Sequence, residues 1–321
     1  MSLEKGITVI ICCYNSSTRI EKTLRSLSKQ DILSKHECEI IVVNNASTDD
    51  TEEVVNQVWE ECGNPYPLKI YFEASPGLAF ARKCGAKQAR YSYGVFCDDD
   101  NWLAPDYLSK VFQIFENNKK IGVIGGVSTP AFDDDANIPP WFYTNCNAYA
   151  VGTQAQATGE ITYRGYVWGA GMGFRTYLLK EIFGSGIEPI ISDRKGELLT
   201  SGGDGEICIW YIFAGYRLWY DETLTFKHYI PKVRLNYSYY EKLLAGFKVD
   251  KKWPVYHNYI ILKYGLFNDP RRKKFPLIFI LVRKIFAILV LLRNINTISL
   301  IRKIEKNVPA LFGQTHYKNE L

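Results

Sequence analysis

Residues 95–102, VFCDDDNW, hold the feature that decides how this chain is organised. An apolar run leads directly into Asp98, Asp99 and Asp100, which is typical of a buried strand that ends at the edge of a sheet. Three adjacent carboxylates repel one another and lower stability unless a cation neutralises them. Mg²⁺ and Mn²⁺ prefer oxygen ligands and often bridge to phosphates. The segment therefore predicts a metal–diphosphate site at the carboxyl end of a strand, with a solvated acidic turn or a helix cap as the alternative.

Apolar runs alternate with helical patterns on both sides of this segment. We expect strands at residues 7–13, 39–43, 68–72 and 93–97, with helices between them that include 51–60 and 77–90. The first helix should open with a capping box formed by Thr18 and Glu21. Strands joined by helices pair in parallel through right-handed crossovers, so the fold class is α/β, with a mainly parallel sheet flanked by helices.

In such sheets, ligands bind beyond the carboxyl ends of the strands. Here those ends carry Tyr14 and Asn15, Asn44 and Asn45, and the three aspartates. Three polar clusters are therefore expected to converge on one edge of the sheet.

The pattern is less regular beyond residue 105. We expect a helix at 106–116 and strands at 123–130, 218–220 and 224–228. We expect a rigid aromatic turn at residues 139–142 (PPWF), and the glycines of 166–174 (YVWGAGMGF) should let the backbone approach a ligand closely. The candidate ligand-binding residues of this region are Trp141, Trp168, Gly169, Ala170 and Gly171.

The composition is that of an ordinary globular protein. The chain has 321 residues, 47% hydrophobic and 23% charged, which allows one large domain with an appendage or two domains. Its eight cysteines include no C-x-x-C pair, which predicts a reducing compartment and argues against a disulfide framework or a zinc site. The apolar stretch near the start is too short and too poorly flanked for a signal peptide, so we expect a cytoplasmic protein.

Charge is distributed unevenly along the chain. Residues 227–321 contain 19 Lys and Arg against 5 Asp and Glu, whereas the first 226 residues contain 20 against 29. A nucleic-acid binder would carry its basic stripe on the folded domain, so no nucleic acid is expected as a partner. A basic and apolar tail instead favours contact with an anionic membrane surface.

Within this tail, residues 275–292 (FPLIFILVRKIFAILVLL) are apolar apart from a central Arg-Lys pair. The segment is at the short limit for a membrane span, and a charged pair at the bilayer centre would be costly. We therefore expect helices at the membrane interface, in a protein that is peripheral on the cytoplasmic face of the inner membrane. The alternative is a helical hairpin packed on the main domain.

A series of motifs, in this order, resembles the family 2 glycosyltransferases of the bacterial surface-polysaccharide type, which are inverting enzymes with the GT-A fold. The motifs are YN at 14–15, VVNNASTD at 42–49, EASPGLAFARK at 73–83, FCDDDNWLAPDYL at 96–108, GGDGE at 202–206, AGYRLWYDE at 214–222 and KHYIP at 227–231. The resemblance implies a Rossmann-like GT-A domain at 1–236, with a nucleotide-binding half at about 1–125 and an acceptor-binding half at about 126–236. A helical membrane-associating region would follow at 237–321.

The resemblance also implies roles for individual residues. Asp100 is the expected direct ligand of Mn²⁺ or Mg²⁺, His228 and Asp98 complete the metal site, and Asp204 is the expected catalytic base. The implied donor-binding residues are Cys13, Tyr14, Asn15, Asn44, Asn45, Arg82, Asp98 and Asp99. Structural roles remain open for three of these residues: a hydrogen-bonded strand end for His228, a helix N-cap for Asp204 and a surface salt bridge for Arg82.

Two positions depart from the family's pattern. Asn44 and Asn45 stand where the family usually has two aspartates, the second of which often accepts the uracil N–H. An asparagine carbonyl can also accept this bond, so a UDP-sugar remains the expected donor. The motif GGD replaces the commoner GED, which removes one acidic neighbour from Asp204.

The sequence thus predicts an enzyme that moves one sugar from a UDP-sugar to a glycan acceptor, lipid-linked, in the assembly of cell-surface polysaccharide or glycoconjugate. One alternative is a processive synthase of the same fold, although several spans and a QxxRW motif would be expected and neither is evident. Another is a non-catalytic sugar-nucleotide-binding scaffold, which would not need both Asp100 and Asp204. Nucleotidyltransferases and dehydrogenases carry a glycine-rich loop after their first strand, and residues 12–19 (CCYNSSTR) lack it.

Overall fold

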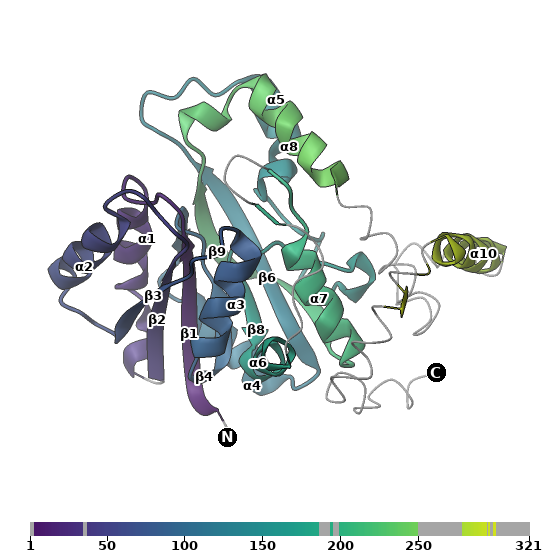
Figure 1. Ribbon diagram of the computed structural model, residues 1–321, viewed down its shortest axis with the longest axis horizontal. Coiled ribbons are helices and arrows are strands. Elements are labelled where there is room, and N and C mark those ends of the chain that lie inside the picture. Colours follow the sequence, from purple (N-terminus) through teal and green to yellow (C-terminus); the bar gives the residue numbers. More distant parts are fainter. Residues whose placement is uncertain are drawn as a thin grey trace.

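The computed structural model describes residues 3–34, 37–185, 193–194, 199–249, 278–293, 295 and 298–299 (Figure 1). Here η denotes a 3₁₀ helix. The first part of the chain forms β1 (Glu4–Cys13), α1 (Ile20–Leu27), η1 (Asp31–Ser34), β2 (Glu37–Asn44), α2 (Thr51–Glu61), β3 (Leu68–Phe72), α3 (Leu78–Gln88), β4 (Tyr91–Phe96), β5 (Asn101–Leu103) and α4 (Tyr107–Asn117). The second part forms β6 (Ile121–Ala131), α5 (Pro140–Asn145), η2 (Cys146–Tyr149), β7 (Gly159–Glu160), η3 (Thr162–Arg164), β8 (Met172–Arg175), α6 (Thr176–Gly184), α7 (Gly203–Phe213), β9 (Arg217–Tyr229), η4 (Lys232–Arg234), α8 (Tyr237–Val249) and α10 (Ile278–Leu292).

The first four strands form a parallel sheet in the order β3-β2-β1-β4, as the alternation of strands and helices predicts. Ile10 of β1 pairs with Ile41 of β2 on one side and with Phe96 of β4 on the other. Strands β1, β2 and β4 are largely buried on both faces, which explains their continuous apolar sequence. Their carboxyl ends consequently meet at one edge of the sheet.

The second part extends the sheet and makes it mixed. β8 is antiparallel to both β4 and β6, β9 runs parallel to β6, and the short β5 and β7 pair with β9. The two strands expected at 218–220 and 224–228 are one long strand, β9, whose register with β6 shifts at Gly125 to Val127. The antiparallel pairing of β9 with β5 places His228 opposite Asn101, next to the three aspartates in the chain.

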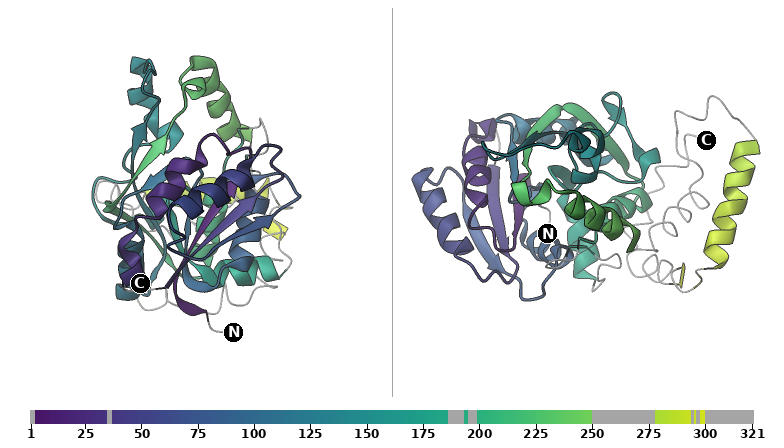
Figure 2. Two further views of the ribbon diagram at one scale, coloured as in Figure 1. Left: turned by 90° about the vertical axis from the view of Figure 1, so that its left-hand side faces the viewer. Right: turned by 90° about the horizontal axis from the view of Figure 1, so that it is seen from above.

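Helices cover both faces of the sheet (Figure 2). Alternate residues of β1 point to opposite faces, so Ile10 belongs to the core under α3, α6 and α7, whereas Val9 and Ile11 belong to the core under α1, α2 and α4. A smaller third cluster joins α5 to α8, with Phe142 and Leu243 both buried. The mainly parallel α/β architecture predicted from the sequence is therefore confirmed.

The predicted capping box at the first helix is wrong. α1 begins at Ile20, its N-cap residue is Arg19, and no side-chain hydrogen bond caps it. The Arg19 guanidinium instead reaches Asp99, so a contact between distant segments replaces the local one.

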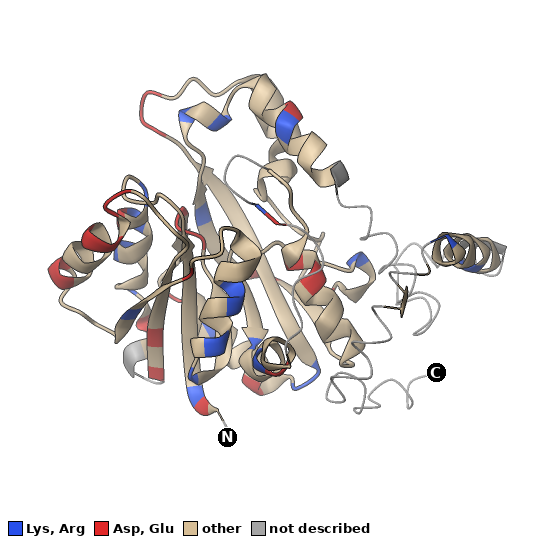
Figure 3. Ribbon diagram, in the orientation of Figure 1, with Lys and Arg blue, Asp and Glu red and all other residues tan. Residues whose placement is uncertain are grey.

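The tail is only partly described. α10 exposes a series of apolar side chains that includes Leu281, Ile285 and Phe286. Its sequence includes the Arg283-Lys284 pair, and Figure 3 shows basic positions in blue on this helix. Within the described residues, none of the helices combines the length and the apolarity that a membrane crossing requires. The basic run at 271–274 lies outside the described residues, and the boundary predicted at residue 236 stays a prediction.

Candidate active site

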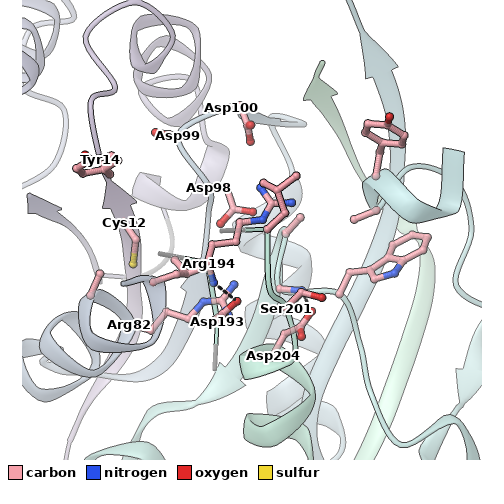
Figure 4. A pocket seen from close by; sticks show the side chains of 18 of the residues that line it. Cys12, Tyr14, Arg82, Asp98, Asp99, Asp100, Asp193, Arg194, Ser201 and Asp204 are labelled. Carbon is pink, nitrogen blue, oxygen red and sulfur yellow. Dashed lines mark hydrogen bonds and ion pairs between the residues drawn. The ribbon is translucent and has the colours of Figure 1, made fainter. Parts of the chain in front are cut away.

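A cavity of about 1090 Å³ lies at the carboxyl ends of β1, β2 and β4 (Figure 4). The predicted site residues that line it are Cys13, Tyr14, Asn45, Arg82, Asp98, Asp99, Asp100, Trp168, Gly169, Ala170, Asp204 and His228. Its opposite wall comes from the segment before β8, the start of α7 and helix α8. The fold therefore gathers around one cavity residues that are as far apart in the sequence as Cys12 and Phe247.

Four predicted site residues do not line the cavity. Asn15 accepts a hydrogen bond from the Thr48 N–H, and Asn44 donates to Glu52. Gly171 accepts a bond from the Tyr107 hydroxyl through its carbonyl oxygen. Trp141 packs against Tyr237 and Tyr240 in the cluster between α5 and α8.

The three consecutive aspartates point to different partners. Asp99 is buried, forms an ion pair with Arg19 at 2.6 Å and accepts a hydrogen bond from Ser16 Oγ. Asp100 faces His228 and Arg234 on the other side, and Asp98 opens to the cavity. Burial raises the pKa of Asp98, and the positive charge of Arg82 offsets only part of this rise. The divergence lowers the mutual repulsion that the sequence implied.

Asp100 is the best-partnered of the three. Its Oδ1 lies 3.4 Å from His228 Nε2 and 3.1 Å from the Asn101 Nδ2 donor, and its Oδ2 lies 3.1 Å from Arg234 Nη1. Burial alone would disfavour the carboxylate, but His228, Arg234 and Arg19 outweigh it and hold the pKa of Asp100 well below its usual range. Asp100 is therefore a fixed anion at the edge of the cavity.

A divalent metal ion fits these residues only with ligands from outside the protein. Among the described residues, no three His, Cys, Asp or Glu side chains gather into a metal-binding group, and the metal role of Asp98 stays a prediction. The Asp100–His228 pair lines the cavity, and the buried His228 Nδ1 has no hydrogen-bond partner. Mg²⁺ and similar ions commonly take one or two protein ligands and fill the other positions with water and phosphate oxygens.

Arg82 lies on α3 at the floor of the cavity. Its side chain is buried, its Nη1 lies 3.1 Å from Asp193 Oδ2, and its guanidinium lies over the Phe96 ring. The surface salt bridge that the sequence left open is therefore wrong, because the pair is enclosed. A buried guanidinium beside a cavity is suited to hold an anion.

Asp204 lies across the cavity from the strand ends. It belongs to the first turn of α7, whose N-cap residue is Gly202, so the N-cap role left open for Asp204 is also wrong. Its Oδ2 accepts the Gly169 N–H at 3.0 Å and its Oδ1 accepts the Gly205 N–H at 2.8 Å. Two backbone donors thus orient a carboxylate that lines the cavity.

Asn45 is held by the protein's own backbone. Its amide nitrogen donates to the carbonyl oxygens of Glu73 and Ser75, at 3.1 and 2.7 Å, and its oxygen accepts the Gly77 N–H at 2.7 Å. An aspartate could not make the first two bonds, because it has no amide N–H to donate. The side chain fixes the 73–77 loop, which precedes α3 and Arg82.

Sequence reasoning missed four charged residues that line the cavity: Arg19, Asp193, Arg194 and Arg234. Arg19 and Arg234 follow recognised motifs by only a few residues, so proximity to YN and KHYIP could have signalled them. Asp193 lies in the connection between α6 and α7, where no sequence pattern marks it.

A mainly parallel sheet with carboxylates at its strand ends, facing a further acid across a cavity, is characteristic of GT-A glycosyltransferases. The family model "Glycosyl transferase family 2" matches residues 8–183, more than half of the chain. The chain therefore belongs to glycosyl transferase family 2.

Known proteins similar to this chain agree with that assignment. The poly-beta-1,6-N-acetyl-D-glucosamine synthases of Staphylococcus aureus (strain COL) and Staphylococcus epidermidis are 31% and 30% identical over 122 residues, which cover 38% of this chain. The matched region spans 28% of the length of these relatives.

Two solved structures have a similar fold. S. aureus TarS 1–349 in complex with UDP-GlcNAc is 18% identical, with a TM-score of 0.51, over 88% of this chain and 79% of that one. The mannosyltransferase PcManGT from Pyrobaculum calidifontis, in complex with GDP-Man and Mn²⁺, is 17% identical, with a TM-score of 0.54, over 100% of this chain and 89% of that one. At this identity the similarity concerns the GT-A fold.

Proposed function

We propose that this protein is a metal-dependent, inverting glycosyltransferase that moves one sugar from a UDP-sugar to a glycan acceptor. The observation that carries the proposal is the cavity itself, in which Asp204 faces Arg82 and the Asp100–His228 pair. A transfer reaction needs a base for the acceptor and positive charge for the leaving diphosphate, and these residues supply both around one space.

The donor would bind at the strand ends of the first half. Tyr14 is 46% exposed beside the cavity, so its ring can stack on a base, and Cys13 forms the floor next to it. Asn45 would support this region by fixing the 73–77 loop, while its carbonyl oxygen keeps a second lone pair for the uracil N–H. Arg82 would bind the diphosphate.

Asp100 and His228 would hold Mn²⁺ or Mg²⁺ together with diphosphate oxygens and water. The ion would neutralise the charge that develops on the leaving diphosphate. Arg234, which already pairs with Asp100, would add positive charge at the same place. Asp99 would act indirectly, because its pairing with Arg19 joins the end of β4 to the start of α1.

Asp204 would act as the base. The Gly169 and Gly205 N–H groups fix its carboxylate, and a remaining lone pair can take the proton from the acceptor hydroxyl as that oxygen attacks C1 of the donor sugar. Attack from the side opposite the diphosphate inverts the configuration at C1. The acceptor would lie along Trp168, Gly169 and Ala170, with Tyr239 of α8 on the outer side.

The membrane is the proposed source of the acceptor. The exposed apolar side chains of α10 and its Arg-Lys pair fit a helix at the interface of an anionic bilayer, on the cytoplasmic face of the inner membrane. A lipid-linked glycan in surface-polysaccharide assembly would be presented there. A second candidate is processive polymerisation, because the curated relatives are named as polymer synthases; the chain length of the product separates the two.

The test is a thermal-shift screen of the purified protein with UDP, GDP, dTDP and their sugar conjugates, with Mn²⁺ and with EDTA. We expect a Mn²⁺-dependent rise in melting temperature with UDP or a UDP-sugar, because a ligand that binds only the native state stabilises it. A rise with GDP or dTDP would replace the proposed donor. If no nucleotide raises the melting temperature, the proposed donor site is wrong. If sugar transfer survives EDTA, the proposed metal requirement is wrong.

A further inference from the structure

The buried carboxylate opposite Arg82 comes from a segment that the motifs do not include. Asp193 lies between α6 and α7, and its side chain, like that of Arg82, is almost fully buried, with exposures of 5% and 6%. Both residues line the cavity, and their ion pair is drawn in Figure 4. A buried guanidinium without a fixed partner is strongly destabilising, so the position of Arg82 depends on this carboxylate.

Two hydrogen bonds hold the Asp193 segment in place, and a third orients the Asp193 carboxylate. The Leu78 N–H, at the start of α3, donates to the Arg194 carbonyl at 3.0 Å, and Thr200 Oγ1 donates to the Asp193 carbonyl at 2.8 Å. The Arg194 N–H donates to Asp193 Oδ1, which leaves Oδ2 directed at Arg82. The segment is thus attached to the helix that carries Arg82.

Two glycines leave the room that this ion pair occupies. A Cβ at Gly203 would lie 2.3 Å from Asp193 Oδ2, and a Cβ at Gly169 would lie 2.3 Å from Arg82 Nη2. Neither glycine is among the residues with positive φ in the described chain. Space, and not backbone conformation, therefore explains glycine at both positions, and Gly203 immediately precedes Asp204.

Asp193 also determines what Arg82 leaves free. Asp98 and Asp204 are the other carboxylates whose charge acts on Arg82. Without Asp193, the guanidinium would turn toward one of them, and pairing with Asp204 would block the carboxylate that is to accept the proton. An ion pair with Asp193 keeps the guanidinium and Asp204 apart.

We propose that Asp193 is a positioning residue: it occupies the space that Gly203 leaves beside Asp204 and holds Arg82 in the orientation that binds the donor diphosphate. The proposal rests on the proposed function, in which Arg82 binds the diphosphate and Asp204 acts as the base. Gly203 and Asp193 then form a matched pair, because a side chain at 203 and a carboxylate at 193 compete for the same space.

The experiment compares Asp193→Ala, Gly203→Ala and the two double variants Asp193→Ala/Gly203→Ala and Asp193→Ala/Gly203→Asp with the wild type. We measure UDP affinity with Mn²⁺, kcat and KM for the donor, and melting temperature. Asp193→Ala should weaken UDP binding and raise the donor KM by about tenfold to a hundredfold, the scale of a misplaced substrate-positioning group. Gly203→Ala alone should weaken UDP binding and raise the donor KM to a similar extent. Added to Asp193→Ala, it should cause no further change in either quantity.

The double variant with aspartate at 203 tests the mechanism by relocation. A Cβ at position 203 lies 2.3 Å from the place that Asp193 Oδ2 occupies in the wild type. This is about the distance between the Cβ and a carboxylate oxygen of one aspartate, so an aspartate at position 203 can place its own oxygen there and return the negative charge to Arg82. We expect UDP affinity and donor KM to recover to within about threefold of the wild type, whereas a merely structural role would restore only the melting temperature.

Two outcomes would overturn the proposal. One is wild-type donor affinity and KM in Asp193→Ala; the other is no recovery of UDP affinity in a relocated variant that melts like the wild type. Failure of the proposed function would look different, because the wild type itself would then bind no nucleotide. Even in that case, the melting temperatures of the single and double variants show whether the effects of substitutions at positions 193 and 203 depend on each other.

Discussion

Polar side chains from the two halves of the sheet meet at the same edge but are used differently. In the first half, Asn44, Asn45 and Asp99 have their polar atoms engaged by Glu52, by loop backbone and by Arg19. In the second half, Asp204 and His228 face the cavity, and the Asp204 carboxylate is oriented by two glycine N–H groups. The first set mainly holds the loops in place, with one lone pair of Asn45 left for the proposed uracil contact, and the second set is directed at the ligand space.

The difference shows why residue type alone did not separate structural from functional positions. A carboxylate or amide at a strand end can satisfy loop backbone, neutralise a neighbouring arginine or face the ligand. The outcome depends on what the opposing segment supplies. Substitutions in the two sets should therefore have different consequences, for stability in the first and for transfer in the second.

The largest effect is expected at Asp204. Asp204→Asn removes the proton acceptor while keeping the size of the side chain, so sugar transfer should fall by about 10² or more, with UDP affinity nearly unchanged. Steady-state transfer assays and UDP titration measure the two quantities. Asp50→Asn, at the exposed N-cap position of α2, is the matched control and should keep full activity. Unchanged turnover in Asp204→Asn would move this residue into the structural set.

An intermediate effect is expected at Asn45. Asn45→Asp restores the family's common residue but places a carboxylate against the carbonyl oxygens of Glu73 and Ser75, at the loss of two hydrogen bonds. We expect the free energy of unfolding to fall by about 1–3 kcal/mol, measured by urea denaturation. Asn56→Asp, on the exposed face of α2, is the control. A variant as stable as the wild type with tighter UDP binding would place Asn45 in the functional set.

The smallest effect is expected at Glu116, near the amino end of β1 and away from the cavity. The hydrogen bond from the Tyr93 hydroxyl, together with Lys5 and Lys119, lowers the pKa of Glu116 from 4.5 to about 2. A carboxylate with a lowered folded-state pKa stabilises the protein above pH 4.5, and this contribution disappears as the pH falls toward 2.

Glu116→Gln should therefore lose about 1 kcal/mol of stability at pH 7, a value reduced because the side chain is 25% exposed. The difference from the wild type should shrink steadily between pH 4.5 and the acid limit in urea denaturation curves, while transfer activity at pH 7 is unchanged. A difference that grows toward low pH would contradict the ion-pair explanation.

Sequence patterns located the framework of the site accurately and its contacts poorly. The apolar runs predicted β1, β2 and β4, and the segment VFCDDDNW was correctly placed at a strand end, because burial on both faces dictates a continuous apolar sequence. The predicted N-terminal cap at Thr18 and the cap role left open for Asp204 are wrong, because tertiary partners replaced local ones. Trp141 shares an aromatic cluster with α8 and does not line the cavity.

The sequence by itself determined that this chain forms a mainly parallel α/β sheet with acidic residues at one edge, and it predicted correctly that the chain belongs to glycosyl transferase family 2. These conclusions depend on periodicity and on motif order, which are local properties of the chain. Only the tertiary structure decided which polar side chains face the cavity and which arginine each carboxylate pairs with. Asp193 is the clearest case: no motif marks it, and its partner Arg82 lies 111 positions earlier in the chain. Ion pairs in an enclosed cavity are set by which segments meet in three dimensions, and single-sequence patterns do not record that.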